Sequence, residues 1–263
     1  MLNSKKIDSL IEISKEAGNS IMDIYKTNFD YEMKEDDSPL TLADKTSNEI
    51  ICQSLKKLTP DIPILSEENS DIPYNERIKW RKYWLVDPLD GTKEFIKKND
   101  EFTTNIALIC KNRPVFGIIH IPAKNETFWG QEDKGSYSLA GDNKNEIKKT
   151  KVTENKDGPL RIVTSKSHPS IQLKELLRKL DNYELINVGS SIKFCLVASG
   201  KADCYPRLGP TCEWDIAAGD AILKFAGGSI LNLDGTDVDY NKKSLLNSHF
   251  IAAGKRSISL ELF

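Results

Sequence analysis

The sequence predicts an α+β N-terminal half followed by an α/β C-terminal half. In the first half, two amphipathic helices precede a series of apolar, β-branched-rich runs that are typical of an antiparallel sheet. In the second half, strand and helix patterns alternate, which indicates an α/β layer. The polar stretch "GDNKNEIKKTKVTENKDG" at 141–158 separates the two patterns. We therefore predict an N-terminal domain at 1–157 and a C-terminal domain at 158–263.

The first half opens with two helices, in which apolar residues recur at steps of three and four. The polar loop "KEDDSPLT" separates them. The second helix ends before Pro60, because the residue preceding a proline disfavours the helical conformation. The apolar positions are Ile7, Leu10, Ile11, Ala17, Ile21, Ile24 and Tyr25 in the first helix and Ile50, Ile51, Leu55 and Leu58 in the second.

Strands follow the helices. "IPILSEE" and "YWLVD" are short apolar runs that end in acidic residues, as expected for buried strands with charge at their carboxyl ends. "TTNIALICKNRPVFGIIHIP" holds two β-branched-rich runs around "KNRP" and predicts a hairpin, and "ETFWG" and "SYSLA" predict further strands. The basic run "ERIKWRKYW" (Glu76–Trp84) is interpreted as a solvated loop or helix face.

The second half alternates regularly between the two kinds of pattern. "LRIVTSKS", "YELINVG" and "ADCYPRL" predict strands, whereas "IQLKELLRKL", "SSIKFCLVASG" and "WDIAAGDAILKFAGG" predict helices. Ser190 is a suitable N-cap for the second of these helices, because its hydroxyl can accept a hydrogen bond from a free N–H group of the first turn. Glycines end the third helix.

Composition excludes several classes of function. The 263 residues carry a net charge of −2 and give a pI near 6.0, so the global charge does not favour nucleic acid or a membrane surface. No apolar run reaches the roughly 18 residues of a membrane span, and the acid-containing N-terminus does not resemble a targeting signal. Five scattered cysteines do not indicate structural zinc or a disulfide framework. We expect a compact cytoplasmic protein, and we leave peripheral contact with the inner membrane open.

One acidic pair requires an explanation. Asp87 and Asp90 lie three residues apart in "WLVDPLDGTKEF", and two charges roughly 4 Å apart repel by about 4 kcal/mol at an effective dielectric of about 20. Pro88 fixes the turn, and Gly91 lets the backbone approach a ligand closely. Thr92 follows at the start of a predicted helix, whose free N–H groups favour an anion. Hard cations between the carboxylates would offset the repulsion, and two Mg²⁺ ions about 3.5–4 Å apart suit phosphoryl transfer.

Three more acids stand where a strand or loop ends, and each has a structural alternative. Asp44 after "LTLA" could be a cap or turn residue, and Glu67 after "PILS" could be a solvated strand end. Asp215 in "CEWDIAAG" opens a helix, where the macrodipole favours an acid. The glycine motifs of the two commonest nucleotide-binding loops are absent from the sequence. The isolated histidines are interpreted as structural: His120, His168 and His249.

Together these residues resemble a known superfamily. "EE" at 67–68, "DPLDGT" at 87–92 and "WD" at 214–215 resemble the lithium-sensitive, Mg²⁺-dependent phosphatases, which include inositol monophosphatases, fructose-1,6-bisphosphatases and bisphosphate nucleotidases. "LTLADK", "DGTKEF", "FTTNIALI" and the run from "GSSIKF" to "AGDAIL" resemble the bacterial 3′(2′),5′-bisphosphate nucleotidase branch more closely. The resemblance spans most of the chain and implies a layered α/β/α/β/α sugar-phosphatase fold.

The resemblance also implies a role for individual residues. Two or three Mg²⁺ ions would be held by Glu67, Asp87, the backbone carbonyl of Leu89, Asp90 and Asp215. The residues that would orient and activate a metal-bound water are Asp44, Glu67 and Thr92. The implied substrate contacts are Glu67, Leu89, Asp90, Gly91, Thr92, Ser190, Lys193, Arg207 and Asp215. The alternative for the nucleotide-side residues is a simple helix cap at Ser190 and solvated charges at Lys193 and Arg207.

The expected activity is hydrolysis of the 3′-phosphate of adenosine 3′,5′-bisphosphate to AMP and phosphate by metal-activated water. The expected partner is therefore a small bisphosphate nucleotide, and we expect a monomer or a homodimer. An inositol monophosphatase, or another small sugar-phosphate phosphatase, is the alternative enzyme, because the metal core is common to both. A catalytically silent nucleotide or metal sensor is the alternative outside enzymology. The retention of Thr92, Asp44 and every implied ligand argues against a sensor.

Overall fold

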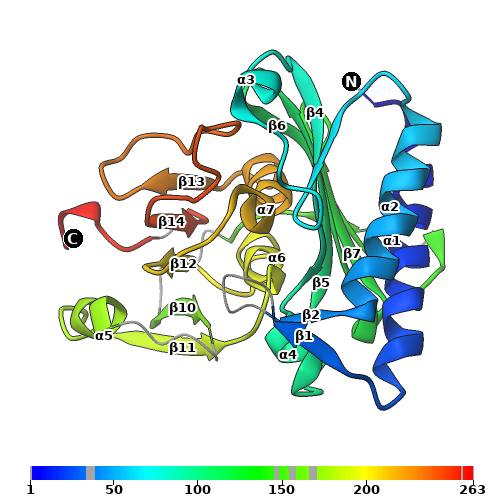
Figure 1. Ribbon diagram of the computed structural model, residues 1–263. Helices are drawn as coiled ribbons and strands as arrows, with labels where there is room; N and C mark the ends of the chain where they lie inside the picture. The colour runs from blue at the N-terminus through cyan, green and yellow to red at the C-terminus, as the bar shows by residue number, and fades with distance from the viewer. Residues whose placement is uncertain are drawn as a thin grey trace.

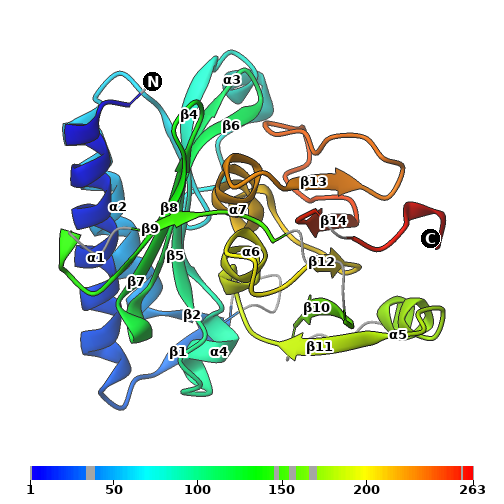
Figure 2. The ribbon, with the colours of Figure 1, turned by 180° about the vertical axis from the view of Figure 1, so that it is seen from behind.

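Five layers stack across the molecule, as the computed structural model shows in two opposite views (Figures 1 and 2). Helices α1 (Ser4–Tyr25) and α2 (Leu42–Leu58) cover one face of a seven-stranded sheet. Helices α6 (Ile192–Ala198) and α7 (Glu213–Phe225) separate this sheet from a five-stranded sheet, and α5 (Ile171–Leu177) packs on the far side. The α/β/α/β/α layering that the sequence led us to expect is confirmed. The described residues are 2–33, 39–144, 148–153, 158–165, 171–255 and 257–262.

The larger sheet is built from consecutive neighbours. Its strands β3 and β4 are parallel, and every later neighbouring pair is antiparallel. Lys111 and Asn112 join β5 and β6 with φ values of 50° and 58°, as a two-residue hairpin turn requires, and this confirms the predicted hairpin. In order across the sheet the strands are β3 (Ile64–Ser66), β4 (Lys82–Asp90), β5 (Thr103–Cys110), β6 (Arg113–Ile121), β7 (Glu126–Gln131), β8 (Gly135–Ala140) and β9 (Lys148–Thr150).

Strands β4, β5 and β6 of this sheet are largely buried and rich in apolar residues because helices cover both faces. In β4, Trp84 and Val86 pack with the α1 and α2 side chains, whereas Tyr83 and Leu85 pack toward α6 and α7. Neighbouring strand residues point to opposite faces, so a strand buried on both sides must be apolar at every position. In the described part of the chain, no helix is both long enough and apolar enough to cross a membrane.

The smaller sheet confirms the alternation of strands and helices in the second half. Its central strand β12 is parallel to β10 and antiparallel to β14. The order is β11 (Tyr183–Asn187), β10 (Leu160–Thr164), β12 (Cys204–Arg207), β14 (Phe250–Ala253) and β13 (Ser229–Asn232). The remaining short elements are β1 (Tyr31–Met33), β2 (Pro39–Thr41), α3 (Tyr74–Arg77), α4 (Thr92–Ile96), η1 (Pro122–Lys124) and η3 (Leu260–Leu262).

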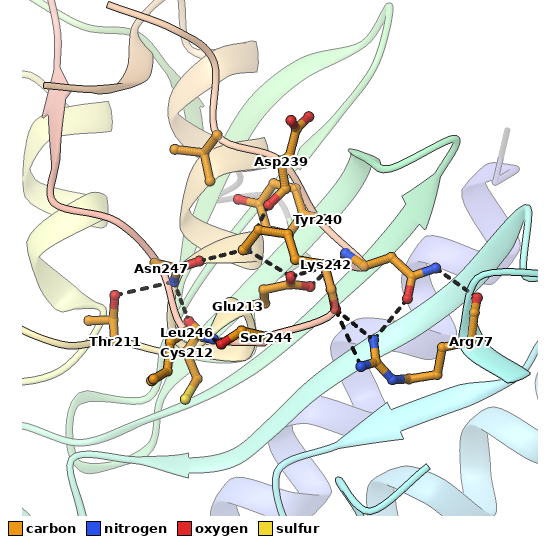
Figure 3. A network of polar contacts seen from close by, with 12 residues as sticks. Arg77, Thr211, Cys212, Glu213, Asp239, Tyr240, Lys242, Ser244, Leu246 and Asn247 are labelled. Atoms are coloured by element: carbon orange, nitrogen blue, oxygen red, sulfur yellow. Dashed lines mark hydrogen bonds and ion pairs between the residues drawn. The ribbon is translucent and has the colours of Figure 1, made fainter. Parts of the chain in front are cut away.

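Two local predictions are wrong. Ser190 is not the N-cap of α6, because the helix begins at Ile192 with Ser191 as the N-cap residue, and Ser190 has a left-handed φ of 46°. The basic run Glu76–Trp84 is not uniformly solvated, because Arg77 is only 3% exposed. The Arg77 guanidinium donates to Asn241 Oδ1 (3.0 Å) in the polar network of Figure 3. The contact of Arg77 with Asn241 could not be predicted from local sequence, since the two residues are 164 positions apart in the chain.

The predicted domain division remains a prediction. Residues 154–157, next to the proposed boundary, lie outside the described residues. Side chains from both sheets meet in one apolar cluster around α6 and α7, for example Leu85 and Ile119 with Tyr205 and Phe250. The halves therefore share a core layer, whatever the position of the boundary.

Helix α7 approaches the larger sheet so closely that two strand positions require glycine. A Cβ atom on Gly117 of β6 would lie 2.3 Å from the carbonyl oxygen of Ala218. A Cβ atom on Gly130 of β7 would lie 2.9 Å from Cα of Ile222. The start of α7, which carries Asp215, is thereby held at a fixed height over the sheet.

We predict that Gly117→Ala destabilises the protein by about 1–3 kcal/mol, because the added methyl group meets backbone atoms that cannot rotate away. Urea unfolding measures the change. Gly209→Ala is the matched control, since a Cβ atom there meets nothing closer than Cζ of Arg207 at 3.9 Å. Wild-type stability of Gly117→Ala would contradict the close packing of α7 on the sheet.

Candidate functional site

A cleft of about 350 Å³ lies where the two halves meet. Nearly all of the predicted site residues line it, although they come from β4, α4, β12 and the starts of α6 and α7. Asp44 is the exception, because it lies behind Thr92 and accepts a hydrogen bond from its hydroxyl at Oδ1 (3.2 Å). The structure thus brings the set together, while the role of each member remains a prediction. The lining residues from the predicted set are Glu67, Asp87, Leu89, Asp90, Gly91, Thr92, Ser190, Lys193, Arg207 and Asp215.

A β-bulge in β4 presents the two aspartates of "DPLD". Asp87 is opposite Asn105 of β5 and Asp90 is opposite Thr103, so three residue steps on β4 match two on its partner. The strand therefore continues past Asp87, where the sequence suggested that it ended. The Leu89 N–H group donates to Asp87 Oδ1 (3.1 Å), which fixes the carboxylate within the bulge. Bulges commonly re-aim side chains near active sites.

The acidic end of the cleft is strongly self-repelling. Burial raises the pKa of Asp87 well above its ordinary value, and the negative charges of Glu67, Asp90, Asp215 and Asp44 raise it further. Removal from water also raises the pKa of Asp215, and Asp90 and Glu67 add to that effect. Like charges in a poorly hydrated site disfavour the ionised form, so metal-free protein holds these carboxylates at a cost in free energy.

The donor set fits Mg²⁺. It consists of carboxylate and carbonyl oxygens, which are the ligands that hard cations prefer. Within the described residues, no three His, Cys, Asp or Glu side chains converge as a ready-made ligand cage. Mg²⁺ ordinarily takes only one or two carboxylates and completes its shell with water and phosphate oxygens. The acidic side chains and the Leu89 backbone line an open cleft, which leaves room for the water and phosphate ligands that Mg²⁺ prefers.

Asp44 and Thr92 form a fixed pair. Asp44 is the third residue of α2, and its Oδ2 accepts hydrogen bonds from the N–H group (2.7 Å) and the hydroxyl (2.6 Å) of Thr41 in a capping box. Its Oδ1 accepts from Thr92, whose hydroxyl also lies 3.3 Å from the Leu89 carbonyl. The cap-residue interpretation of Asp44 is therefore correct, and the same carboxylate also meets the cleft through Thr92.

Ser191 is a site residue that sequence reasoning missed. Its N–H group and its hydroxyl both donate to Asp90 Oδ2, each at 2.5 Å. The Ser191 hydroxyl in turn accepts from Asn105 Nδ2 (2.6 Å). Asp90 of the first half is thus held by the α6 N-terminus of the second half. The available signal was the second serine of "GSS" directly before the helix.

Two cationic side chains, Lys193 and Arg207, also line the cleft. Lys193 is 5% exposed, and its ammonium donates to the Ser190 carbonyl and lies 5.3 Å from the Tyr205 ring centroid. Burial lowers the pKa of Lys193 to about 8, against the opposing charge of Asp90. The solvated-charge alternative is therefore wrong for Lys193. Arg207 donates from Nη2 to the Pro210 carbonyl (2.7 Å), and its buried Nε has no partner among the described residues.

Comparison with known proteins decides the family. A family model described as the inositol monophosphatase family matches residues 3–259. The chain belongs to the inositol monophosphatase family. The 3′(2′),5′-bisphosphate nucleotidase CysQ of Escherichia coli K12 is 42% identical over 248 residues, which cover 93% of this chain and 98% of that protein. The CysQ of Haemophilus influenzae is 38% identical over 259 residues, or 97% and 95% of the two chains.

Solved structures agree with this family assignment. The crystal structure of CysQ from Bacteroides thetaiotaomicron superimposes with a TM-score of 0.85 at 39% identity, over 96% of this chain and 98% of that chain. An inositol monophosphatase from Thermotoga maritima has a TM-score of 0.80 at 24% identity, over 95% and 92% of the two chains, and shows a shared fold. The layered fold of this chain is therefore the inositol monophosphatase fold.

We predict that Asp87→Asn stabilises the metal-free protein at neutral pH and weakens its response to Mg²⁺. The pKa of Asp87 is higher in the folded than in the unfolded chain, so the folded state binds more protons and stability falls as pH rises above about 4. The advantage of the variant should shrink toward acidic pH, where wild-type Asp87 is protonated. Thermal unfolding with EDTA and with Mg²⁺, at several pH values, measures both effects.

Asp87→Asn should also lower the activity. We expect a loss of at least roughly 10–100-fold, which is the cost of removing a residue that supports a metal ligand. Asp71→Asn is the control, because Asp71 is an exposed acid that does not line the cleft. A metal-free Asp87→Asn protein that is less stable than wild type at neutral pH would contradict the repulsion argument.

Proposed function

We propose that this chain is a Mg²⁺-dependent 3′(2′),5′-bisphosphate nucleotidase that hydrolyses adenosine 3′,5′-bisphosphate to AMP and phosphate. The supporting observation is a single cleft that is lined both by carboxylates and by the cationic side chains of Lys193 and Arg207. A bisphosphate nucleotide has two phosphates. One would be cleaved beside the metal ions, and the other would be bound by the cationic side chains. The similarity to CysQ proteins over more than nine-tenths of the chain supports the same substrate.

The metal-binding residues in this proposal are Glu67, Asp87, the Leu89 carbonyl, Asp90 and Asp215, with two or three Mg²⁺ ions. When bound, Mg²⁺ lowers the pKa of a coordinated water and neutralises charge on the phosphoryl group and the leaving oxygen. The acidic end of the cleft supplies the negative charge that attracts these ions. The hydrogen bonds of Asp87 to Leu89 and of Asp90 to Ser191 orient two of the carboxylates before any ion arrives.

Thr92 and Asp44 are proposed to prepare the attacking water, together with Glu67. The Thr92 hydroxyl can donate its single proton to Asp44 Oδ1 (3.2 Å) or to the Leu89 carbonyl (3.3 Å), and in either case its oxygen keeps lone pairs that can accept a proton from water. Asp44 in turn is fixed by Thr41, so the hydroxyl cannot rotate freely toward solvent. Gly91 and Thr92 also open α4, where free N–H groups can meet phosphate oxygens.

The second phosphate is proposed to bind beside Lys193 and Arg207. Arg207 lines the cleft, and its planar guanidinium suits bidentate contact with a phosphate. Lys193 contributes a buried point charge, and Ser190 contributes a hydroxyl from the loop before α6. An inositol monophosphatase would share the metal-binding carboxylates, but its substrate has only one phosphate to bind. Fructose 1,6-bisphosphate has two phosphates, so only a comparison of turnover separates a phosphatase for that sugar from a nucleotidase. A cytoplasmic setting and a monomeric or homodimeric state are further parts of the proposal.

Phosphate release from adenosine 3′,5′-bisphosphate, inositol 1-phosphate and fructose 1,6-bisphosphate, with and without Mg²⁺, tests the substrate. We expect the nucleotide to be preferred in kcat/KM and no turnover without the ion. Arg207→Gln should lower kcat/KM for the nucleotide by about 10–100-fold, because a hydrogen bond to a charged group is lost. The same change should leave inositol 1-phosphate nearly unaffected.

Arg178→Gln is the matched control, since Arg178 is exposed and lies beyond α5, away from the cleft. Equal or faster turnover of inositol 1-phosphate by the wild type would overturn the nucleotide assignment. Mg²⁺-dependent binding of the nucleotide without phosphate release would favour the sensor.

The role of Thr92 is tested by a hydroxyl deletion of the same shape. Thr92→Val should lower kcat by about 10²–10⁴-fold, because proton acceptance from water is lost. Its KM should change little, and its melting temperature should stay close to that of wild type because Thr92 is partly exposed. Thr92→Ser keeps the hydroxyl and should retain most activity. A Thr92→Val enzyme with wild-type kcat would remove Thr92 from the mechanism.

A further inference from the structure

A buried ionic cluster lies just behind the start of α7 (Figure 3). Glu213 is fully buried, and its carboxylate accepts from the backbone N–H groups of Asn241 (2.8 Å) and Lys242 (3.0 Å) and from the Lys242 ammonium (2.8 Å). Arg77 of α3 donates to Asn241 Oδ1 and to the Lys242 carbonyl (3.3 Å), and Asn241 Nδ2 donates back to the Arg77 carbonyl (2.7 Å). We call Glu213, Lys242, Asn241 and Arg77 the Glu213 cluster.

The Glu213 cluster fixes a segment that has little regular structure. Residues 245–247 run antiparallel to 211–213: the Glu213 N–H group donates to the Leu245 carbonyl (2.9 Å), and the Asn247 N–H group donates to the Thr211 carbonyl (2.8 Å). Asn247 Nδ2 adds a bond to the Cys212 carbonyl (2.7 Å), and the Lys242 ammonium reaches Asn247 Oδ1 (3.2 Å). The segment is therefore held on its backbone and on its side chains.

This attachment places one leucine in the core and the next at the cleft. Leu245 packs against the apolar cluster between the sheets, whereas Leu246 is 57% exposed and lines the cleft. Leu246 pairs with Cys212, whose N–H group donates to Asp215 Oδ2 (2.8 Å). Leu246 is thus linked through Cys212 to Asp215, one of the carboxylates of the cleft.

An exposed leucine is ordinary by itself, but an exposed leucine held by a buried ion pair is not. Burying the Glu213 charge costs free energy, so the stability that the ion pair adds does not by itself account for it. Beside Leu246, the cleft is lined by Trp214 and Pro210, so this part of its rim is apolar. A nucleobase has flat apolar faces that such a rim can cover, whereas inositol and sugar phosphates carry hydroxyl groups around the ring.

We propose that Leu246 is a specificity-determining residue that packs against the base of the nucleotide, and that the Glu213 cluster positions it. This inference rests on the proposed nucleotide substrate and deepens it. Glu213, Lys242 and Arg77 are positioning residues, because they act through residues 245–247 and do not line the cleft.

The test compares two probes that share a ribose and a 5′-phosphate and differ in the base: AMP and ribose 5-phosphate. Their affinities are measured by calorimetry in the presence of Mg²⁺. Leu246→Ala should weaken AMP about fivefold, because part of the apolar contact is lost, and should leave ribose 5-phosphate nearly unchanged. Ile171→Ala is the matched control, since Ile171 is an exposed apolar residue (72%) on α5, away from the cleft.

A double-mutant cycle separates positioning from mere stabilisation. Glu213→Gln should weaken AMP on its own, but should add nothing once Leu246 is alanine. Lys242→Arg should preserve AMP affinity, because the cationic partner is retained. Where Glu213→Gln folds poorly, Lys242→Gln makes the same comparison, since the Lys242 side chain is 30% exposed.

Failure of this inference is distinct from failure of the proposed function. If the wild type releases no phosphate but Leu246→Ala selectively weakens AMP binding, the proposed nucleotidase function is wrong and the inference about Leu246 stands. Equal AMP affinity in the wild type and in Leu246→Ala, including none measurable in either, overturns the inference even if the nucleotide is hydrolysed. Equal weakening of AMP and ribose 5-phosphate also overturns it. Additive effects of Glu213→Gln and Leu246→Ala would overturn the positioning role of the cluster.

Discussion

Mutual repulsion among the carboxylates of the cleft is the constraint on which the rest of the structure depends. Burial and the charges of Glu67 and Asp90 raise the pKa values of Asp87 and Asp215, so the folded chain holds negative charge where it is disfavoured. Other contacts must keep these groups in place. The bulge in β4, the Thr41 capping box and the Ser191 hydrogen bonds each fix one acidic group or its neighbour. The repulsion costs stability locally, and a hard cation bound among these carboxylates would offset that cost.

The same constraint explains why the cleft lies between two sheets. Asp87 and Asp90 belong to the first sheet, whereas Asp215 begins the helix that packs between both sheets. Ser191 brings the second half to Asp90, and Arg77 brings the first half to the loop beside Glu213. Each half thus holds residues that the other half needs. The cationic residues Lys193 and Arg207 come wholly from the second half, so a substrate with two phosphates would bridge the halves.

Local spacing made much of the site predictable. Asp87, Leu89, Asp90, Gly91 and Thr92 are consecutive or nearly so, and their chemistry is readable because one bulge and one helix start carry them all. Glu67 could also be predicted as a cleft residue, because it directly follows β3, which pairs with β4. The hairpin of β5 and β6 was also predictable, because its turn depends on only two residues.

Other residues could not be assigned from the sequence, because their roles depend on partners far along the chain. Ser190 and Ser191 look equivalent as letters, yet only Ser191 reaches Asp90, since a left-handed Ser190 turns the chain just before α6. Arg77 lies in a basic run that looked solvated, and only a loop 164 residues away makes it a buried donor. Leu246 carries no motif at all.

The sequence by itself predicted most of the helices and strands, the family and the acidic residues that line the cleft, because periodicity and short-range spacing encode them. The tertiary structure alone decided which serine holds Asp90, why Lys193 is buried and which leucine stands at the cleft. The physical reason is that burial and hydrogen bonding are set by whatever packs against a residue, and for these residues the neighbours come from other elements of the fold.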